Sequence, residues 1–248
     1  MVRYQEDPVR MLRSIRFMAK LEMFLDKPSE APIRQLAPLL ANIPAARLFD
    51  ESLKLLQTGN GVKTYQLLRQ YGLFEPLFPA LMPYFTERND SLAEKIILTA
   101  LRSTDERVAD KLRLNPAFLF AAFFWYPLRE KVEQLKNEGG LNNHDAYALA
   151  ANDVLDQFCK TLAAPRRHTS APLRTLEQQK FRAAFDLLAM RAEIEGGEAI
   201  ELTKWWHEFQ FSTEQQRQEM LKERSRQAPS VKKRRYRTKR KAKPVEAS

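Results

Sequence analysis

The 248-residue sequence is poor in cysteine, in glycine and in long apolar runs. Its single cysteine, Cys159, excludes a disulfide within the chain and fits a reducing compartment. Only seven glycines and few alternating Val and Thr positions argue against an extended sheet. The most apolar run, residues 117–128, is shorter than the roughly 20 residues of a membrane span, and no signal peptide is recognisable. We therefore expect a soluble, cytoplasmic protein with no membrane partner.

Recognisable catalytic motifs are missing as well. His144, His168 and His207 are scattered and form no metal-ligand pattern with acidic residues or cysteine. The sequence contains no glycine-rich phosphate loop and no Ser/His/Asp arrangement with local support. We therefore assign no metal site and no catalytic residue to this chain.

The residues that are present predict an all-α fold. Hydrophobic residues make up 44% of the sequence, and 14 prolines separate apolar stretches of helical period. The run at residues 117–125 is apolar all round and is expected to lie at the centre of the core. The expected helices span residues 8–20, 33–40, 44–56, 62–71, 91–101, 105–112, 117–125, 145–162, 181–195 and 198–211, with a last polar helix after Ser212-Thr213.

The first of these helices has two chemically different faces. Asp7-Pro8 is a helix-start signal, with the aspartate as the expected cap. At 100° per residue the apolar side chains fall on one face, namely Met11, Leu12, Ile15, Met18 and Ala19. The opposite face carries Arg10, Arg13, Arg16 and Lys20, with Phe17 and Asp7 beside them. Such a face suits a nucleotide, although an ordinary solvated stripe with a capping aspartate is the alternative.

Positive charge is concentrated at the C-terminal end. The net charge is +10, and residues 231–248 hold nine of the 41 basic residues but one of the 31 acidic ones. Such a composition predicts a disordered tail that binds polyanions without sequence preference. The basic loop at Arg166 and Arg167 could also touch phosphate. Solubility and nonspecific adhesion are the alternatives for the tail.

Residues 6–17 closely resemble the neck motif of the class II nucleotidyltransferases, which comprise the bacterial poly(A) polymerases and the tRNA CCA-adding enzymes. That motif is Glu-Asp-x-x-Arg followed by Leu-Arg-Ala-x-Arg-Phe, and Ser14 replaces its alanine here. The resemblance implies that Asp7 and Arg10 contact the base edge of the incoming nucleotide. It places Glu6 and Arg13 beside them, with Arg3, Arg16 and Phe17 as pocket support.

A second run, Pro44-x-x-Arg47-hydrophobic-x-x-Glu51, is similar to one that shapes the neck under the nucleotide pocket in this family. The resemblance implies a supporting role for Arg47 and Glu51. Pairing along the surface of one helix is the alternative for these charges.

Two later runs, Phe-Arg-Ala-Ala-Phe-Asp at residues 181–186 and Trp-Trp-x-x-Phe-Gln at residues 205–210, look like poly(A) polymerase rather than CCA-adding enzyme. The implied organisation is a neck at residues 1–60, a helical body at residues 61–211, and a polar helix with a basic tail at residues 212–248. The segment at residues 169–179 is shorter than the family leads us to expect. The resemblance implies that the polyanion bound by the basic tail is RNA. The residues expected to contact it are Arg166, Arg167, Lys232, Lys233, Arg234, Arg235, Arg237, Lys239, Arg240 and Lys241.

The family's metal-binding carboxylates belong to a Gly-Ser…Asp-x-Asp motif in a head domain, and this sequence contains neither element. The resemblance therefore implies the C-terminal part of an enzyme that adds AMP from ATP to RNA 3′-ends with Mg²⁺. We expect the chain alone to bind RNA, to hold neither ATP nor Mg²⁺, and to be inactive without a head domain, which could be separately encoded. The alternatives are a stand-alone RNA-binding adaptor and a fragment of a CCA-adding enzyme.

Overall fold

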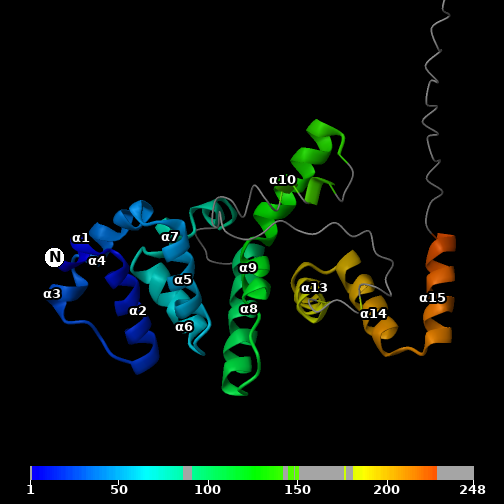
Figure 1. Ribbon diagram of the computed structural model, residues 1–248, viewed down its shortest axis with the longest axis horizontal. Helices are drawn as coiled ribbons and strands as arrows, with labels where there is room; N and C mark the ends of the chain where they lie inside the picture. The colour runs from blue at the N-terminus through cyan, green and yellow to red at the C-terminus, as the bar shows by residue number, and fades with distance from the viewer. Residues whose placement is uncertain are drawn as a thin grey trace, which may run out of the picture. The chain divides into compact units, whose positions relative to one another are not determined.

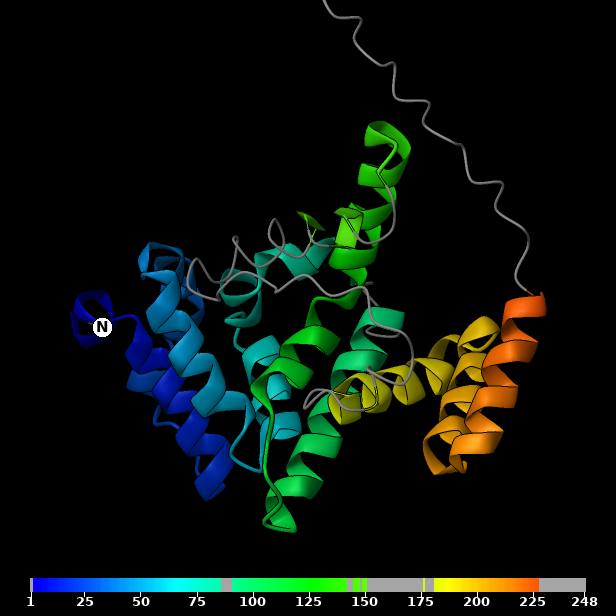
Figure 2. The same ribbon diagram turned by 45° about the vertical axis from the view of Figure 1, so that its right-hand side comes forward.

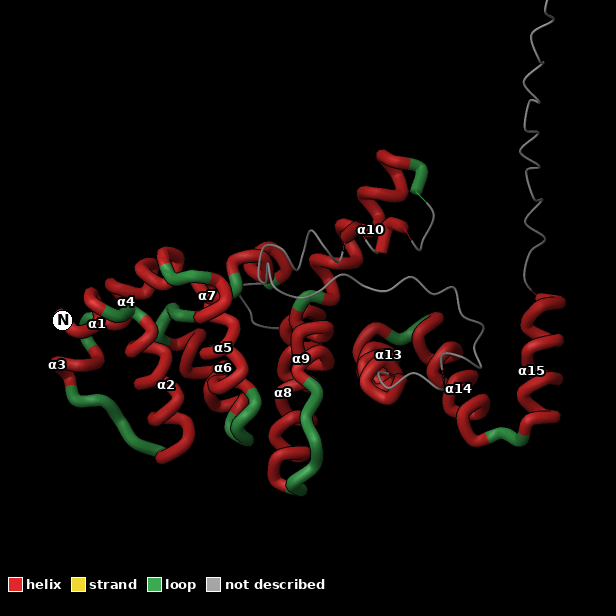
Figure 3. Tube along the Cα trace, in the orientation of Figure 1, coloured by secondary structure: helices red, strands yellow, loops and turns green. Residues whose placement is uncertain are grey.

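The structure, a computed structural model, describes residues 2–85, 91–141, 145–147, 149–150, 176 and 181–227. Helices and loops account for all of these residues, and Figure 3 shows no strand among them. The all-α fold class predicted from the sequence is therefore confirmed. The chain divides into two units, Met1–Lys204 and Trp205–Ser248. No helix in the described part is both long and apolar enough to cross a membrane.

The neck begins with α1 (Val2–Glu6) and α2 (Val9–Leu21). The predicted apolar face of α2 is buried, and Val9 joins it. The prediction that Asp7 caps this helix is wrong, because no side chain caps α2 and the Asp7 carboxylate binds Arg47 instead. The helix ends at Leu21, where Glu22 adopts a left-handed backbone conformation with φ of 54°.

Helices α5 (Ala45–Leu56) and α6 (Gly61–Gln70) pack against α2, and the three lie side by side in both ribbon views (Figures 1 and 2). Both helices match the predicted bounds within one residue. Three short elements connect α2 to α5, namely α3 (Lys27–Glu30), α4 (Ile33–Leu36) and the 3₁₀ helix η1 (Ala37–Asn42).

The body core is rich in phenylalanine. It forms between α7 (Phe74–Leu77), the 3₁₀ helix η2 (Pro79–Tyr84) and α9 (Pro116–Phe123). The Phe78 and Phe123 rings lie 5.3 Å apart, and Phe74 lies 5.1 Å from Phe78. The expected core role of residues 117–125 is confirmed, with one correction. Ala117 and Ala121 are exposed, because alanine exposes too little apolar surface to require burial on every side of α9.

The two short helices predicted at residues 91–101 and 105–112 form one helix, α8 (Leu92–Ala109). The polar turn between them continues the helix, and within it the Thr104 hydroxyl is satisfied by donating to the Ala100 carbonyl at 2.8 Å. Asp105 does not start a helix of its own. Its carboxylate accepts the backbone N–H groups of Gly61 at 2.7 Å and Val62 at 3.1 Å, so it caps the first turn of α6 from α8.

The carboxylate of Glu195 joins α13 (Phe181–Glu195) to α10 (Trp125–Gly139) through hydrogen bonds. The Glu195 carboxylate accepts hydrogen bonds from Trp125 at 3.2 Å, Tyr126 at 3.0 Å and Arg191 at 2.8 Å. Burial opposes ionisation of Glu195, but the hydrogen bonds from Arg191 and Tyr126 and the nearby charges outweigh it and lower the pKa of Glu195.

The last two described helices are α14 (Glu198–Phe211) and α15 (Glu214–Gln227). The predicted cap of the polar helix is confirmed at Thr213, whose hydroxyl accepts the Gln216 N–H while the Gln216 side chain accepts the Thr213 N–H. Trp205 and Trp206 are both half-buried, as expected for neighbours about 100° apart on a helix. Most of the helix predicted at residues 145–162, Cys159 included, lies outside the described residues.

We predict that Asp105→Ala lowers the free energy of unfolding by about 1–2 kcal/mol, because two N–H groups of α6 lose their acceptor. Urea denaturation followed by circular dichroism measures this change. Asp110→Ala is the control, since Asp110 is exposed directly after the last residue of the same helix and accepts no backbone N–H of α6. Equal midpoints for the two variants would contradict the capping role.

We predict that Glu195 stabilises the fold more at neutral than at acidic pH. Because its pKa is lowered on folding, its contribution is present above the ordinary value of 4.5 and is lost as the pH falls through the folded pKa. Glu195→Gln should therefore destabilise the chain at pH 7, with a difference from the unmodified chain that shrinks below pH 4.5. Thermal melts across this range test it, with Glu193→Gln on the exposed side of α13 as the control.

Candidate nucleotide and RNA site

The junction of α1 and α2 holds a carboxylate–guanidinium pair. One nitrogen of Arg47, Nη2, donates to both Asp7 oxygens, at 2.9 and 3.0 Å. Arg10 also lies close to this carboxylate, with its Nε 3.9 Å from the nearer Asp7 oxygen. Arg47 comes from the first turn of α5, so this pair connects the start of α5 to the corner between α1 and α2. The Asp7 carboxylate is thereby oriented while its side chain remains 21% exposed.

A second carboxylate, Glu51, lies one turn further along α5 and is almost fully buried, with 5% of its side chain exposed. Lys54 donates to it at 3.0 Å, and the guanidinium groups of Arg13 and Arg16 lie 3.7 and 3.9 Å away. Three cations share one carboxylate, so the cluster keeps a net positive charge. Since the side chain of Arg13 is 45% exposed, part of that charge faces solvent, where it can attract an anion.

The remaining predicted neck residues lie on α1 and α2. The side chain of Phe17 is half-exposed, and the Arg16 guanidinium lies 5.6 Å from its ring centroid. Arg3 and Glu6 are exposed on α1. Sequence reasoning missed Tyr4, whose hydroxyl lies 3.2 Å from that of Ser14 and links α1 to α2. Ser14, which stands where the family motif has alanine, therefore adds an interhelical contact.

The predicted RNA contacts of the basic loop and tail, Arg166, Arg167 and the cations at residues 232–241, lie outside the described residues. Their roles stay predictions.

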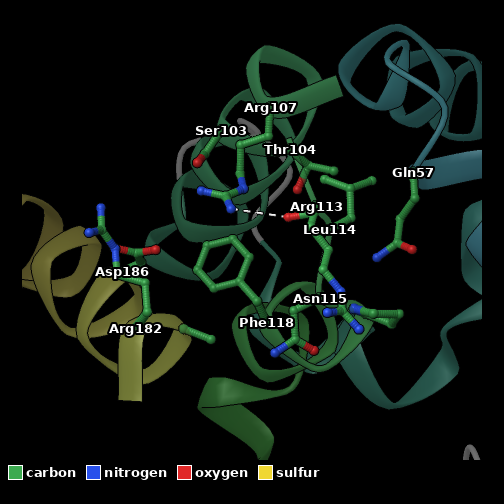
Figure 4. A pocket seen from close by; sticks show the side chains of 12 residues that line it. Gln57, Ser103, Thr104, Arg107, Arg113, Leu114, Asn115, Phe118, Arg182 and Asp186 are labelled. Atoms are coloured by element: carbon green, nitrogen blue, oxygen red, sulfur yellow. Dashed lines mark hydrogen bonds and ion pairs between the residues drawn. The ribbon is translucent and has the colours of Figure 1, made fainter. Parts of the chain in front are cut away.

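Sequence reasoning also missed a pocket of about 770 Å³ in the body (Figure 4). It lies among α8, the loop that leads into α9, and α13, with one residue from the end of α5. Its lining includes Gln57, Ser103, Arg107, Arg113, Phe118 and Arg182. No sequence signal could have found it, because its cations come from three segments and none belongs to a recognisable motif.

Comparison of the sequence with known proteins identifies its relatives. Residues 22–85 match the family described as "Probable RNA and SrmB- binding site of polymerase A", and residues 167–241 match "Polymerase A arginine-rich C-terminus". Poly(A) polymerase I of Haemophilus influenzae is 73% identical over 256 residues, covering 96% of this chain and 57% of that protein. The enzyme of the same name from Salmonella typhimurium is 50% identical, covering 89% of this chain and 52% of that protein.

The chain belongs to the bacterial poly(A) polymerase family. It spans about half the length of the curated relatives it matches, and that half is their C-terminal part. A CCA-adding enzyme of Lactobacillus gasseri is 33% identical over 91 residues, which is 37% of this chain. The poly(A) polymerase resemblance drawn from residues 6–17, 181–186 and 205–210 is thus confirmed.

The two matched families divide the site residues unevenly. Arg47 and Glu51 fall within the first match, whereas Asp7 and Arg10 precede it. The pocket residues Arg107 and Arg113 lie between the two matches, so neither family description covers them.

We predict that Glu51→Gln lowers the free energy of unfolding by about 1–3 kcal/mol, because three neighbouring cations lose their shared counter-charge. Asp50→Asn is the matched control, since Asp50 is the preceding residue of α5 but is exposed. Urea denaturation of both variants tests the difference. A loss no greater for Glu51→Gln than for Asp50→Asn would contradict the organising role of Glu51.

Proposed function

We propose that this chain is the base-recognition and RNA-binding part of a poly(A) polymerase, an enzyme that adds AMP from ATP to RNA 3′-ends. The observation that carries the proposal is the Asp7 carboxylate, oriented by Arg47 and flanked by Arg10, in a chain 73% identical to the corresponding part of a poly(A) polymerase I.

The pairing chemistry suits adenine. An ionised carboxylate only accepts hydrogen bonds, and a guanidinium only donates them. Asp7 is therefore suited to accept from the exocyclic amino group of adenine, while Arg10 donates to a neighbouring ring nitrogen. Arg47 supports this role because its bonds to both Asp7 oxygens fix the orientation of a carboxylate that remains partly exposed. A base with a carbonyl at the amino position would face the carboxylate with two acceptors opposed.

RNA binding is the second role that we propose for this chain. The partly exposed cations around Glu51 lie next to the proposed base site, and Phe17 offers a half-exposed ring for stacking. The arginine-rich segment at residues 167–241 adds charge for phosphate contact. RNA affinity of the chain should accordingly fall steeply as salt rises. In this proposal residues 1–60 act as the neck, residues 61–211 as the body, and residues 212–248 as a basic extension.

The transfer step itself is not assigned to these residues. Within the described ranges, no three His, Cys, Asp or Glu side chains gather as ligands for a metal ion, so the residues there do not fit the Mg²⁺ of the reaction. We propose that a domain carrying the family's Gly-Ser and Asp-x-Asp motifs supplies the metal-dependent chemistry.

The test is to join this chain to the N-terminal half of the Haemophilus influenzae relative and to measure AMP and GMP incorporation. Asp7→Asn and Arg10→Gln should each lower kcat/KM for ATP about tenfold or more, because each removes a hydrogen bond to or from a charged group. Asp7→Asn should also reduce the preference for ATP over GTP.

Asp110→Asn is the matched control, because it makes the same chemical change at an exposed carboxylate directly after α8. Thermal melts separate a folding defect from a loss of recognition. Unchanged ATP preference in folded Asp7→Asn would overturn the assignment of the base site.

A further inference from the structure

We propose that the body pocket binds one nucleotide of a single-stranded RNA, with its arginines on phosphate and Phe118 against the base. The inference rests on the proposed function in taking RNA as the ligand. It adds a binding site that is separate from the neck and that neither matched family covers as a whole.

The first wall is the C-terminal end of α8. Lys111 follows this helix with a left-handed backbone, φ 56°, and the Leu112 N–H donates to the Arg107 carbonyl at 2.8 Å. This tight turn reverses the chain directly after α8. The Arg107 guanidinium then donates to the Arg113 carbonyl at 3.0 Å, which fixes the loop (Figure 4). The turn thus places two arginines on one rim of the pocket.

The second wall is the start of α9. The Asn115 side chain accepts the Ala117 N–H at 3.1 Å and so holds the first turn of this helix. Phe118, one residue further, is half-buried, and Figure 4 shows its ring pointing into the space bordered by Arg107 and Asp186. A ring held in this way offers a stacking surface for any base, because stacking is tolerant of base identity.

The third wall is the start of α13. Arg182 is exposed and pairs through its Nε with Asp186 at 2.9 Å, so the one acidic residue of the lining is already matched to a cation. Arg113 has no side-chain hydrogen bond or ion pair to another residue in the described part of the chain. Three guanidinium groups against one carboxylate leave a surplus of two positive charges, which suits a phosphodiester.

The size of the pocket and its position favour an RNA strand as the ligand over a nucleoside triphosphate bound with its metal ion. A volume of about 770 Å³ is large enough for a nucleotide, and the lining has neither a glycine-rich loop nor a set of metal-binding carboxylates. Gln57 at the rim directly follows α5, the helix that carries Arg47. Ten residues of helix span about 15 Å, so one strand can reach both the neck site and the pocket.

The test measures binding of a fluorescein-labelled oligoadenylate to the full chain across a KCl series. Arg113→Gln/Arg182→Gln should make the slope of log affinity against log salt about 1.4 shallower, since each single-strand phosphate contact contributes about 0.7. Lys95→Gln/Arg102→Gln is the matched control, because it removes the same charge from exposed positions of α8 outside the pocket. The control should leave the slope close to that of the unmodified chain.

Phe118→Leu separates stacking from charge. It should weaken binding about fivefold or more at fixed salt, through the lost base contact, and leave the salt slope unchanged. Thermal melts of all variants confirm that each is folded at the assay temperature, and Arg113 and Arg182 are both exposed, so their replacement leaves the core intact.

The outcomes are distinguishable. If the unmodified chain binds the oligoadenylate and the pocket and control double variants behave alike, the pocket inference is overturned and the proposed RNA function stands. If the slope falls but Phe118→Leu binds as the unmodified chain does, the pocket is a general anion site and the nucleotide assignment is overturned. If the unmodified chain does not bind, the proposed RNA function itself fails.

Discussion

The attachment of α5 to α2 through charged groups is the constraint on which the neck depends. The apolar face of α2 is buried, so its cations must face outward, and α5 supplies the carboxylate of Glu51 to hold two of them. The reverse arrangement occurs one turn earlier, where Arg47 of α5 holds the carboxylate of Asp7. Ion pairs of both polarities therefore join α5 to α2 and to the corner that precedes it, which helps to fix the register of the two helices.

These ion pairs determine what the neck can offer a ligand. Glu51 is nearly enclosed and serves three cations at once, so it organises the cluster without neutralising it. Asp7 keeps part of its carboxylate exposed, and Arg10 stays beside it. A hydrogen-bond acceptor and a donor thus lie next to each other near a cluster of net positive charge, an arrangement that suits the nucleotide we propose as the ligand.

Sequence reasoning succeeded where one helix could be interpreted alone. The apolar face of α2, the start of the polar helix at Thr213 and the all-α class were all predicted correctly. Sequence reasoning failed where an acidic side chain could bind either its own helix or a group from a distant segment. Asp7 was expected to cap its own helix and Asp105 to begin a helix, yet Asp7 binds Arg47 and Asp105 caps α6. Local patterns identify the group that needs a partner, but the nearest orphan N–H groups in space belong to other segments.

The sequence by itself determined the helical class, the faces of α2 and the family, because each depends on residues close together in the chain. The tertiary structure alone decided that Arg47 meets Asp7 across 40 residues, and that Arg107, Arg113, Phe118 and Arg182 line one pocket. The physical reason is that helical periodicity shows which side of a helix must be buried, but not which other helix covers it. That choice follows from the packing of many side chains at once, and it places charged groups from distant segments within reach of one another.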